Sequence, residues 1–491
     1  MICRVLAARF AALIVGLLST AGVSLASPDA VFYVDDDASP GGDGLSWASA
    51  FESLPAAGAA AQAFATANPG AAIELRIGQG LYVPPTDNGF LLDIVNGNIS
   101  IRGGYAGLGA ADPDLQQPGS FRTVFSGDVL GNDPPLGSTA DHTLPAFDDN
   151  RRVLINPDEQ GSVEGITFER GMVAMTQLPT LMRDCDFRGM LIGVLGASPT
   201  DRTGIVSLRL LNEISVIERC DFDQNIADTI ASIGVTSPTF VNTLLFDRCR
   251  FRRNVNRSSY GVVDAGLSSN RRPIIILNQC QFIANRVVGT GFQTGAVFLF
   301  LGEGLRVYNS LVYGNIVPVG TGAGVGTVQL QISQNEDRPV VQNTVFWNNV
   351  SEFGDGPNGV IPAPMRFLAG RVLRSNLIEG WNRPEALTDV QPIDDISGIL
   401  DTQPLFVDPE GPDGILGTDD DDFRPAPGSP LIDAGVTVAL PGEVRAGFDA
   451  PWQGAAPLDA AGNPRIVDDA FAVAADPANP IDIGPFELQP S

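Results

Sequence analysis

The sequence has 491 residues, more than one compact core accommodates, so the chain either divides into domains or extends along one axis as a solenoid. Its 55 glycines and 37 prolines disfavour long helices, and its aliphatic residues come in short runs, which indicates many short strands. A formal net charge of −27 excludes nucleic acid and anionic membrane surfaces as good partners.

Residues 1–26 have the pattern of a secretory signal peptide. Arg4 and Arg9 precede an apolar run at 11–18, and a small-x-small cleavage site follows at 24–26. The apolar run is too short to span a bilayer comfortably, and no later segment approaches that length. We therefore expect a secreted or cell-surface protein, without membrane insertion once the signal is removed.

Residues 27–160 are expected to form an N-terminal cap and the first coils of a solenoid. The alanine-rich stretch 48–67 reads as a short amphipathic helix that directs Phe51, Leu54 and Phe64 toward the core. A helix at this position would close the open end of the solenoid.

A six-residue phrase recurs through residues 161–385. It reads Cys-x-Phe-x-x-Asn where it begins at Cys220, Cys249 and Cys280. Partial copies begin at Ile166, Cys185, Ser310, Thr344 and Asn376. Successive copies lie 19, 35, 29, 31, 30, 34 and 32 residues apart, and such self-similarity indicates stacked structural units.

Within each phrase, the residues alternate at a period of two. The first and third residues therefore lie on the inner face of a strand, and the second, such as Asp221 or Arg250, lies on the outer face. The asparagine falls at a turn, where its side chain tolerates the left-handed conformation and bonds to the copies above and below. We therefore predict a ladder formed by Asn225, Asn254, Asn285, Asn315 and Asn349.

The cysteines that remain after signal removal are Cys185, Cys220, Cys249 and Cys280. An even number in an exported protein suggests disulfides, but in this register the side chains stack inside the core at a spacing of about 4.8 Å. That spacing permits a disulfide by distance, yet parallel side chains point the same way, so we favour thiols.

The recurring phrase resembles the right-handed β-helix repeat and the polymorphic outer-membrane protein repeat, over residues 162–382. The entrance segments 33–37, 80–84, 103–105 and 126–128 look like those of exported pectate-lyase-like β-helix proteins of unassigned role. The resemblance and the repeat together imply an all-β fold, a right-handed parallel β-helix solenoid with an N-terminal capping helix and an irregular C-terminal cap.

Residues 386–491 are expected to form this acidic C-terminal cap. Carboxylates spaced closely around glycines suit Ca²⁺, and the run looks like the calcium loops of exported repeat proteins. The candidate ligands are Asp408, Asp413, Asp419, Asp421 and Asp422. A solvated acidic turn is the alternative. The later segments 427–435, 459–465 and 482–487 resemble the recurrent tail of the same exported family.

Candidate catalytic residues lie on the outer face of the repeats. Asp186 and Asp221 occupy equivalent positions in neighbouring coils, Asp223 follows two residues later, and Arg250 lies in the next coil. Two like charges one coil apart would raise one pKa and create an acid/base pair. The mixed signs equally make an exposed salt-bridge ladder, and we favour that interpretation.

Three functions are compatible with this sequence. The first is an exported non-catalytic protein that presents the loops 228–243, 256–272 and 350–363 to a polysaccharide or surface protein. The second is a polysaccharide lyase or glycoside hydrolase acting on an acidic polysaccharide, and the third is a structural envelope component. Calcium is the only cofactor that the sequence suggests.

Overall fold

The computed structural model describes residues 27–90, 92–93, 97–135, 150–153, 155–156, 161–172, 179–191, 204–210, 214–227, 229–235, 243–256, 262–265, 274–287, 295–300, 304–317, 326–330, 340–351, 361–362, 366–367, 372–382, 395–436, 458–465 and 480–489. The predicted signal peptide at residues 1–26 lies outside the described residues, as does half or more of each predicted binding loop.

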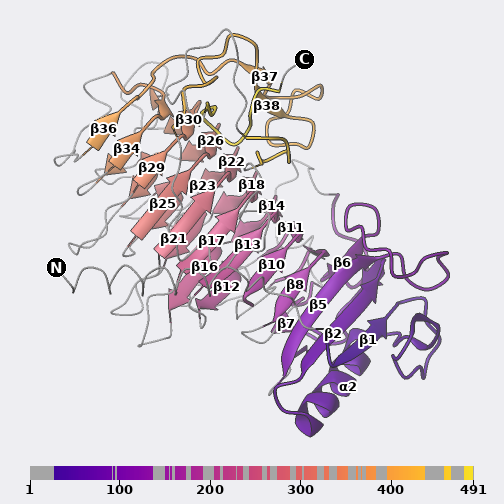
Figure 1. The fold of residues 1–491 in the computed structure, drawn as a ribbon. Helices are drawn as coiled ribbons and strands as arrows, with labels where there is room; N and C mark the ends of the chain where they lie inside the picture. Colours follow the sequence, from indigo (N-terminus) through magenta and orange to yellow (C-terminus); the bar gives the residue numbers. More distant parts are fainter. Residues whose placement is uncertain are drawn as a thin grey trace, which may run out of the picture.

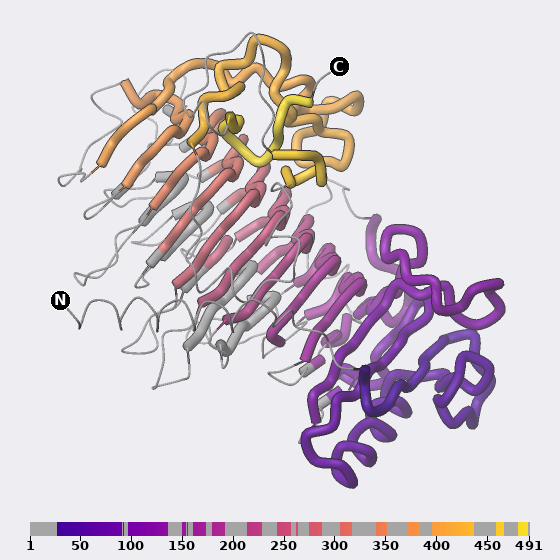
Figure 2. The backbone as a smooth tube through the Cα atoms, viewed as in Figure 1, coloured from indigo at the N-terminus to yellow at the C-terminus, as the bar shows by residue number. Residues whose placement is uncertain are grey.

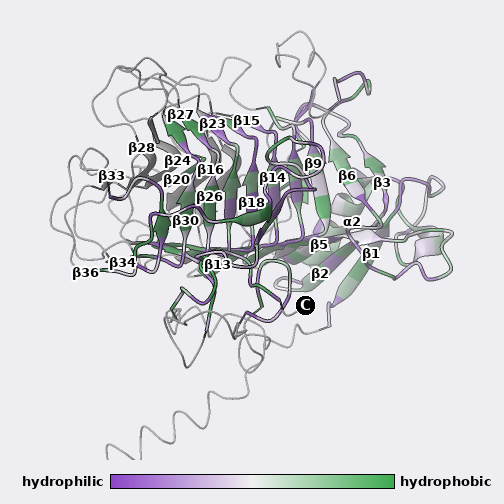
Figure 3. Ribbon diagram, turned by 90° about the horizontal axis from the view of Figure 1, so that it is seen from above, coloured by the Kyte–Doolittle hydropathy of each residue, from purple (hydrophilic) through white to green (hydrophobic). Residues whose placement is uncertain are grey.

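The described chain is an all-β, right-handed parallel β-helix with one α-helix near its N-terminus (Figure 1). Strands far apart in sequence lie side by side in successive coils, as the tube drawing shows (Figure 2). The right-handed coil is the connection that twisted parallel strands favour. Coloured by hydropathy, the strands hold much of the hydrophobic character (Figure 3).

Two long sheets form the walls. The first, called sheet 1, contains in spatial order β1 (Ala30–Val34), β2 (Ala72–Gly78), β5 (Asn98–Tyr105), β8 (Ser162–Glu164), β10 (Leu181–Arg183), β13 (Ile214–Glu218), β17 (Thr243–Asp247), β21 (Ile274–Asn278), β25 (Gly304–Tyr308), β29 (Val340–Gln342), β34 (Val372–Arg374) and β36 (Asp395–Ser397). The second, sheet 2, contains β3 (Gly80–Tyr82), β6 (Thr123–Ser126), β9 (Ile166–Glu169), β11 (Asp186–Arg188), β14 (Asp221–Asp223), β18 (Arg250–Arg252), β22 (Gln281–Ile283), β26 (Leu311–Tyr313), β30 (Val345–Trp347) and β35 (Leu377–Ile378).

Two shorter sheets complete the middle coils. One contains β12 (Gly204–Leu210), β16 (Thr229–Val235), β20 (Val263–Ala265), β24 (Gly295–Phe300), β28 (Gly326–Leu330) and β33 (Arg366–Phe367). The other contains β15 (Ile226–Ala227), β19 (Val255–Asn256), β23 (Arg286–Val287), β27 (Ile316–Val317), β31 (Val350–Ser351) and β32 (Ile361–Pro362). Two strand pairs stand apart, namely β4 (Leu92–Asp93) with β7 (Ile155–Asn156), and β37 (Phe406–Asp408) with β38 (Asp422–Pro425).

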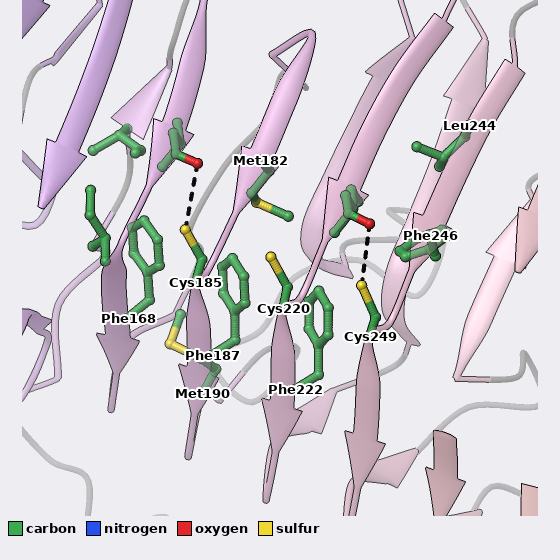
Figure 4. Close-up of a cluster of buried hydrophobic side chains, with 14 of the residues drawn as sticks. Phe168, Met182, Cys185, Phe187, Met190, Cys220, Phe222, Leu244, Phe246 and Cys249 are labelled. Carbon is green, nitrogen blue, oxygen red and sulfur yellow. Dashed lines mark hydrogen bonds between the residues drawn. The ribbon is translucent and has the colours of Figure 1, made fainter. Parts of the chain in front are cut away.

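The phenylalanines of the recurring phrase form one interior row, as predicted. Phe187 pairs in register with Phe222, Phe222 with Phe251, and Phe251 with Phe282. Their rings are stacked with centroids 4.6–4.8 Å apart, and Phe168 extends the row at 5.0 Å (Figure 4). Each ring is fully buried, so the row supplies a continuous apolar wall.

The predicted asparagine ladder is present beside this row. The amide Nδ2 of Asn225 donates to Asn254 Oδ1, Asn254 donates to Asn285, Asn285 to Asn315 and Asn315 to Asn349, each at 2.9 Å. The same Oδ1 atoms also accept the backbone N–H of the preceding asparagine in the ladder. These buried amides therefore satisfy one another from coil to coil.

The left-handed residue at this turn is the one before each asparagine, which corrects the sequence interpretation. Positive φ angles occur at Gln224, Arg253, Ala284, Gly314 and Asn348, and the ladder asparagines have none. A second corner precedes the phrase, where Arg219 and its counterparts also have positive φ. Two such corners confine each sheet 2 strand to about three residues, which explains why the phrase has a fixed length.

The four cysteines are free and buried, in agreement with the prediction of thiols. Cys185, Cys220 and Cys249 lie in a row beside the phenylalanines (Figure 4). Each sits just before its sheet 2 strand, and its Sγ faces backbone carbonyls, as Cys249 does at 3.3 Å from the oxygen of Ile217. They serve as small hydrophobic residues.

The N-terminal end is closed by a helix, as expected. A 3₁₀ turn η1 (Trp47–Ser49) leads to α2 (Leu54–Ala67), whose buried face packs on the first strands. Pro55 lies in the first turn, where proline is tolerated, so it does not break the helix. Phe51 and Phe64 are only partly buried, but both pack against the core.

The C-terminal cap covers the side of the coils. Within the expected cap, 386–491, β36 continues sheet 1, and the described residues beyond 400, namely 401–436, 458–465 and 480–489, are called the tail below. Phe423, Leu431 and Ile483 of the tail pack on outward residues of sheet 2, including Leu311 and Val345. Figure 1 shows β37 and β38 beside β22 and β26. The tail therefore buries an outer face of the β-helix.

Candidate functional site

The outer face of sheet 2 changes character along the axis. Because the central residue of each strand points inward, the flanking residues point out. The outward residues are charged in β11, β14 and β18, namely Asp186, Arg188, Asp221, Asp223, Arg250 and Arg252. In β22, β26, β30 and β35 they include Ile283, Leu311, Tyr313, Val345 and Leu377, which the tail covers. The boundary between the two halves is where the tail meets charged side chains.

A cavity of about 350 Å³ lies at this boundary, between sheet 2 and the tail. It is lined by Asp186, Arg219, Cys220, Asp221, Arg248, Arg250, Arg252, Gln281, Ile283, Thr418, Asp419, Asp421, Phe423, Ala460, Ala461 and Phe486. The cavity thus brings together three predicted catalytic residues, Asp186, Asp221 and Arg250, with two predicted calcium ligands, Asp419 and Asp421. Sequence reasoning placed these two sets in separate sites.

Asp221 is buried and bound by two guanidinium groups. Arg250 Nη2 donates to its Oδ2 at 2.8 Å, and Arg252 Nε donates to its Oδ1 at 3.3 Å. Asp223, the fourth predicted catalytic residue, does not line the cavity and is held by Arg253, whose Nη2 lies 2.8 Å from its Oδ2. Both carboxylates are therefore paired with arginines, as the salt-bridge interpretation expects, but they are buried in the wall rather than exposed, which corrects that interpretation.

Asp186 differs from these two carboxylates. Burial raises its pKa, the guanidinium of Arg188 opposes that rise, and the nearby carboxylate of Asp221 adds to it. Its nearest cation is Arg188, whose Nη2 lies 3.4 Å from Oδ2. A carboxyl group with a raised pKa that lines a cavity has the character of a proton donor.

Arg252 connects the wall to the tail. Its side chain is 2% exposed, and its Nη1 lies 2.8 Å from Oδ1 of Asp419, whose side chain is 69% exposed. Arg250 Nη1 lies 3.5 Å from the same oxygen. Burial pushes the pKa of Asp419 upward, but the two guanidinium groups outweigh burial and lower it. Asp419 is thus an ionised carboxylate between two arginines.

The predicted calcium ligands are engaged separately. Asp413 Oδ1 accepts the N–H of Ile415 at 2.7 Å, and Asp421 Oδ2 accepts the N–H of Gly417 at 2.7 Å. Asp422 pairs with Arg424 through Nε at 2.8 Å, and Asp408 ends the exposed strand β37. Within the described residues, carboxylate oxygens gather within 4.8 Å in two other sets, Asp35, Asp36 and Asp37, and Asp433, Asp482 and Glu487. Calcium binding by the acidic loop stays a prediction.

The second of these sets joins the three tail motifs. Asp433 N–H donates to Asp482 Oδ1 at 2.8 Å, and Glu487 N–H donates to Asp459 Oδ2 at 3.2 Å. The buried Arg465 donates from Nη2 to the carbonyl of Asp482 at 2.7 Å. Burial raises the pKa of Asp482 to about 6. The sequence motifs signalled this cluster, although we expected from them only a cap.

Arg219, Arg248, Phe423 and Phe486 also line the cavity, but sequence reasoning did not assign them to a site. The sequence did contain one signal that another segment covers sheet 2, namely the apolar residues at the outward positions of β26 and β30. A sheet face exposed to water would carry polar residues there.

No protein-family model matches the chain, and no curated protein matches it significantly. Among the described residues, no helix is long and apolar enough to cross a membrane.

Proposed function

We propose that this chain is an exported, non-catalytic β-helix protein that binds glycans or partner proteins outside the cell or at its surface. We further propose that it belongs with the exported pectate-lyase-like and polymorphic outer-membrane protein repeats. The observation that supports binding is the cavity between sheet 2 and the tail, which combines four arginines, four aspartates and two phenylalanines. Concave sites with a few oriented polar groups and apolar walls are typical of small-ligand recognition.

The pairing of the carboxylates argues against catalysis. A glycosidase needs two carboxyl groups free to act on one glycosidic bond. Here Asp221 accepts hydrogen bonds from Arg250 and Arg252, and Asp223 is bound by Arg253. To serve as a base or nucleophile, either would first have to break an ion pair that is buried against the wall.

One observation favours the alternative function, a polysaccharide lyase or glycoside hydrolase. Asp186 lines the cavity with a raised pKa, as a general acid requires, and Arg250 lies in the same register two coils further on. Under this alternative, Asp186 would protonate a leaving group. This alternative lacks a free second carboxyl group, because Asp221 is already paired with Arg250 and Arg252.

Two assays on the mature protein separate these functions. Calorimetric titration with a panel of neutral and uronic-acid-containing oligosaccharides measures binding. Incubation with the corresponding polymers, followed by absorbance at about 235 nm and by reducing ends, measures lyase and hydrolase activity. We expect binding without turnover. Turnover that is lost in Asp186→Asn or Asp221→Ala would establish the enzyme instead.

Arg250→Ala and Arg374→Ala form a matched pair for the binding assay. Both arginines are outward and partly exposed, and each pairs with an aspartate, but Arg374 pairs with Asp395 in β36, away from the cavity. Loss of binding in Arg250→Ala alone would locate the ligand in the cavity. Equal loss in both variants, or in neither, would contradict this location.

Calcium remains a proposal for the acidic loop of the tail. Calorimetric titration of the whole mature protein with CaCl₂ tests it, with Asp413→Ala as the variant. Binding heat that is present in the unchanged protein and absent in Asp413→Ala would support the calcium site. The absence of binding heat at millimolar calcium would contradict it.

A further inference from the structure

The arginine pair of the cavity already holds a carboxylate, which is that of Asp419. Its Oδ1 lies 2.8 Å from Arg252 Nη1 and 3.5 Å from Arg250 Nη1. The two arginines come from β18, whereas Asp419 comes from the tail. A carboxylate supplied from outside the sheet thus occupies a position between two guanidinium groups, which is where a charged ligand would bind.

The contact is incomplete on the arginine side. Arg252 is 2% exposed, and its Nη1 makes no hydrogen bond of acceptable geometry within the described residues, although it lies within ion-pair distance of Asp419. A buried donor without an aligned acceptor is costly. Asp221 binds both Nε and Nη2 of the same guanidinium, so Nη1 of Arg252 is fixed toward the cavity. This nitrogen suits an oxygen that approaches from the cavity.

The two partners differ in how easily they separate. Asp419 is 69% exposed, so water replaces its arginine contacts at small cost when it leaves. Arg252 stays in the wall because Asp221 anchors it. Exchange of Asp419 for another carboxylate therefore leaves sheet 2 unchanged.

We propose that the cavity is a carboxylate-binding site that Asp419 occupies in the free protein, and that the carboxylate of a sugar acid replaces it between Arg250 and Arg252. This proposal rests on the proposed glycan-binding function. It adds that the ligand is a sugar acid and that Asp419 competes with it for the two arginines. Phe423, Phe486 and two alanines of the tail provide an apolar wall for the sugar ring. Gln281 and Thr418 offer polar groups for its hydroxyls.

The ligand's charge separates acidic from neutral sugars at this site. A neutral sugar leaves Asp419 in place, or displaces it without supplying a charge to the guanidinium groups. A sugar acid supplies that charge and can align with Nη1 of Arg252. The cavity volume of about 350 Å³ lies at the lower end of the range of about 300–1,000 Å³ for small-ligand sites, which suits one or two sugar units.

The test compares glucuronic acid with glucose, which lacks the carboxylate, by ligand-observed NMR titration of the mature protein. The variant is Asp419→Asn, which removes the competing charge and keeps the side-chain shape. If Asp419 occupies the arginine pair about nine-tenths of the time, its removal lowers the apparent Kd for glucuronic acid about tenfold. Arg250→Ala should raise that Kd at least tenfold, and neither variant should change the response to glucose.

Asp420→Asn is the matched control, because Asp420 belongs to the same turn but does not line the cavity. It should leave the Kd for glucuronic acid unchanged. Weaker or unchanged binding in Asp419→Asn, or equal tightening in Asp420→Asn, would overturn the proposal. Equal binding of glucose and glucuronic acid would overturn it while leaving glycan binding intact. Failure of these sugars and of the whole oligosaccharide panel would overturn both.

Discussion

The asparagine ladder gives the sharpest test of how the coils are held together, at Asn254. Its Nδ2 donates to the carbonyl of Phe222 at 2.7 Å and to Asn285 Oδ1 at 2.9 Å. Its Oδ1 accepts from the backbone N–H and the Nδ2 of Asn225 at 3.1 and 2.9 Å. All of these groups are buried, so no water replaces the lost partner in Asn254→Ala.

The magnitude follows from these four hydrogen bonds. At about 1 kcal/mol for each bond, Asn254→Ala should lower the free energy of unfolding by about 4 kcal/mol. The measurement is guanidinium denaturation followed by circular dichroism. Asn382→Ala is the control, because Asn382 is exposed and, within the part of the chain that the structure describes, bonds to Asp401 through its backbone N–H alone. It should change stability by no more than about 0.5 kcal/mol. A loss below about 1 kcal/mol in Asn254→Ala would refute the ladder as a source of stability.

Three further predictions concern the core and the tail. Phe251→Ala should cost about 3–5 kcal/mol, because its ring stacks between Phe222 and Phe282, and a thermal midpoint close to that of the unchanged protein would contradict the row. Cys185, Cys220, Cys249 and Cys280 should resist a thiol reagent in the native protein and all react after unfolding without reductant, whereas two or fewer reactive thiols among them would reveal a disulfide. Because burial raises the pKa of Asp482 to about 6, its contribution to stability is complete below about pH 4 and is lost as the pH rises through 6. Asp482→Asn should therefore flatten the pH dependence of urea unfolding between pH 4 and 7, and an unchanged slope would contradict the assignment.

The sequence predicted the wall of the β-helix because its signal is local and repeated. The alternation in Cys220-x-Phe222 fixes which side chains point inward, and the constant phrase fixes the stacking partner in the next coil. The row of phenylalanines, the ladder and the buried thiols all follow from these two facts. The left-handed corner was assigned one residue late, because asparagine tolerates that conformation, whereas arginine and glutamine at the same corner carry no such signal.

The sequence could not predict the cavity. Arg252 and Asp419 are far apart in the chain, and the tail has no repeat that would set its register against sheet 2. Leu311 and Tyr313 did carry a signal, because apolar residues replace the charged outward residues of β14 and β18 there. That change shows that something covers the sheet, but it does not identify the covering segment. A second ladder, in which Asn309 bonds Asn278, was missed because it lies outside the phrase.

The most direct test of the stacked wall is a crystal structure of the mature protein at a resolution that shows ring planes. We predict that Phe187, Phe222, Phe251 and Phe282 occupy one interior row, with neighbouring ring centroids 4.6–4.8 Å apart. An electron-density map that places any of these rings outside the row would contradict the coil-on-coil register, and with it the cavity that sheet 2 and the tail enclose.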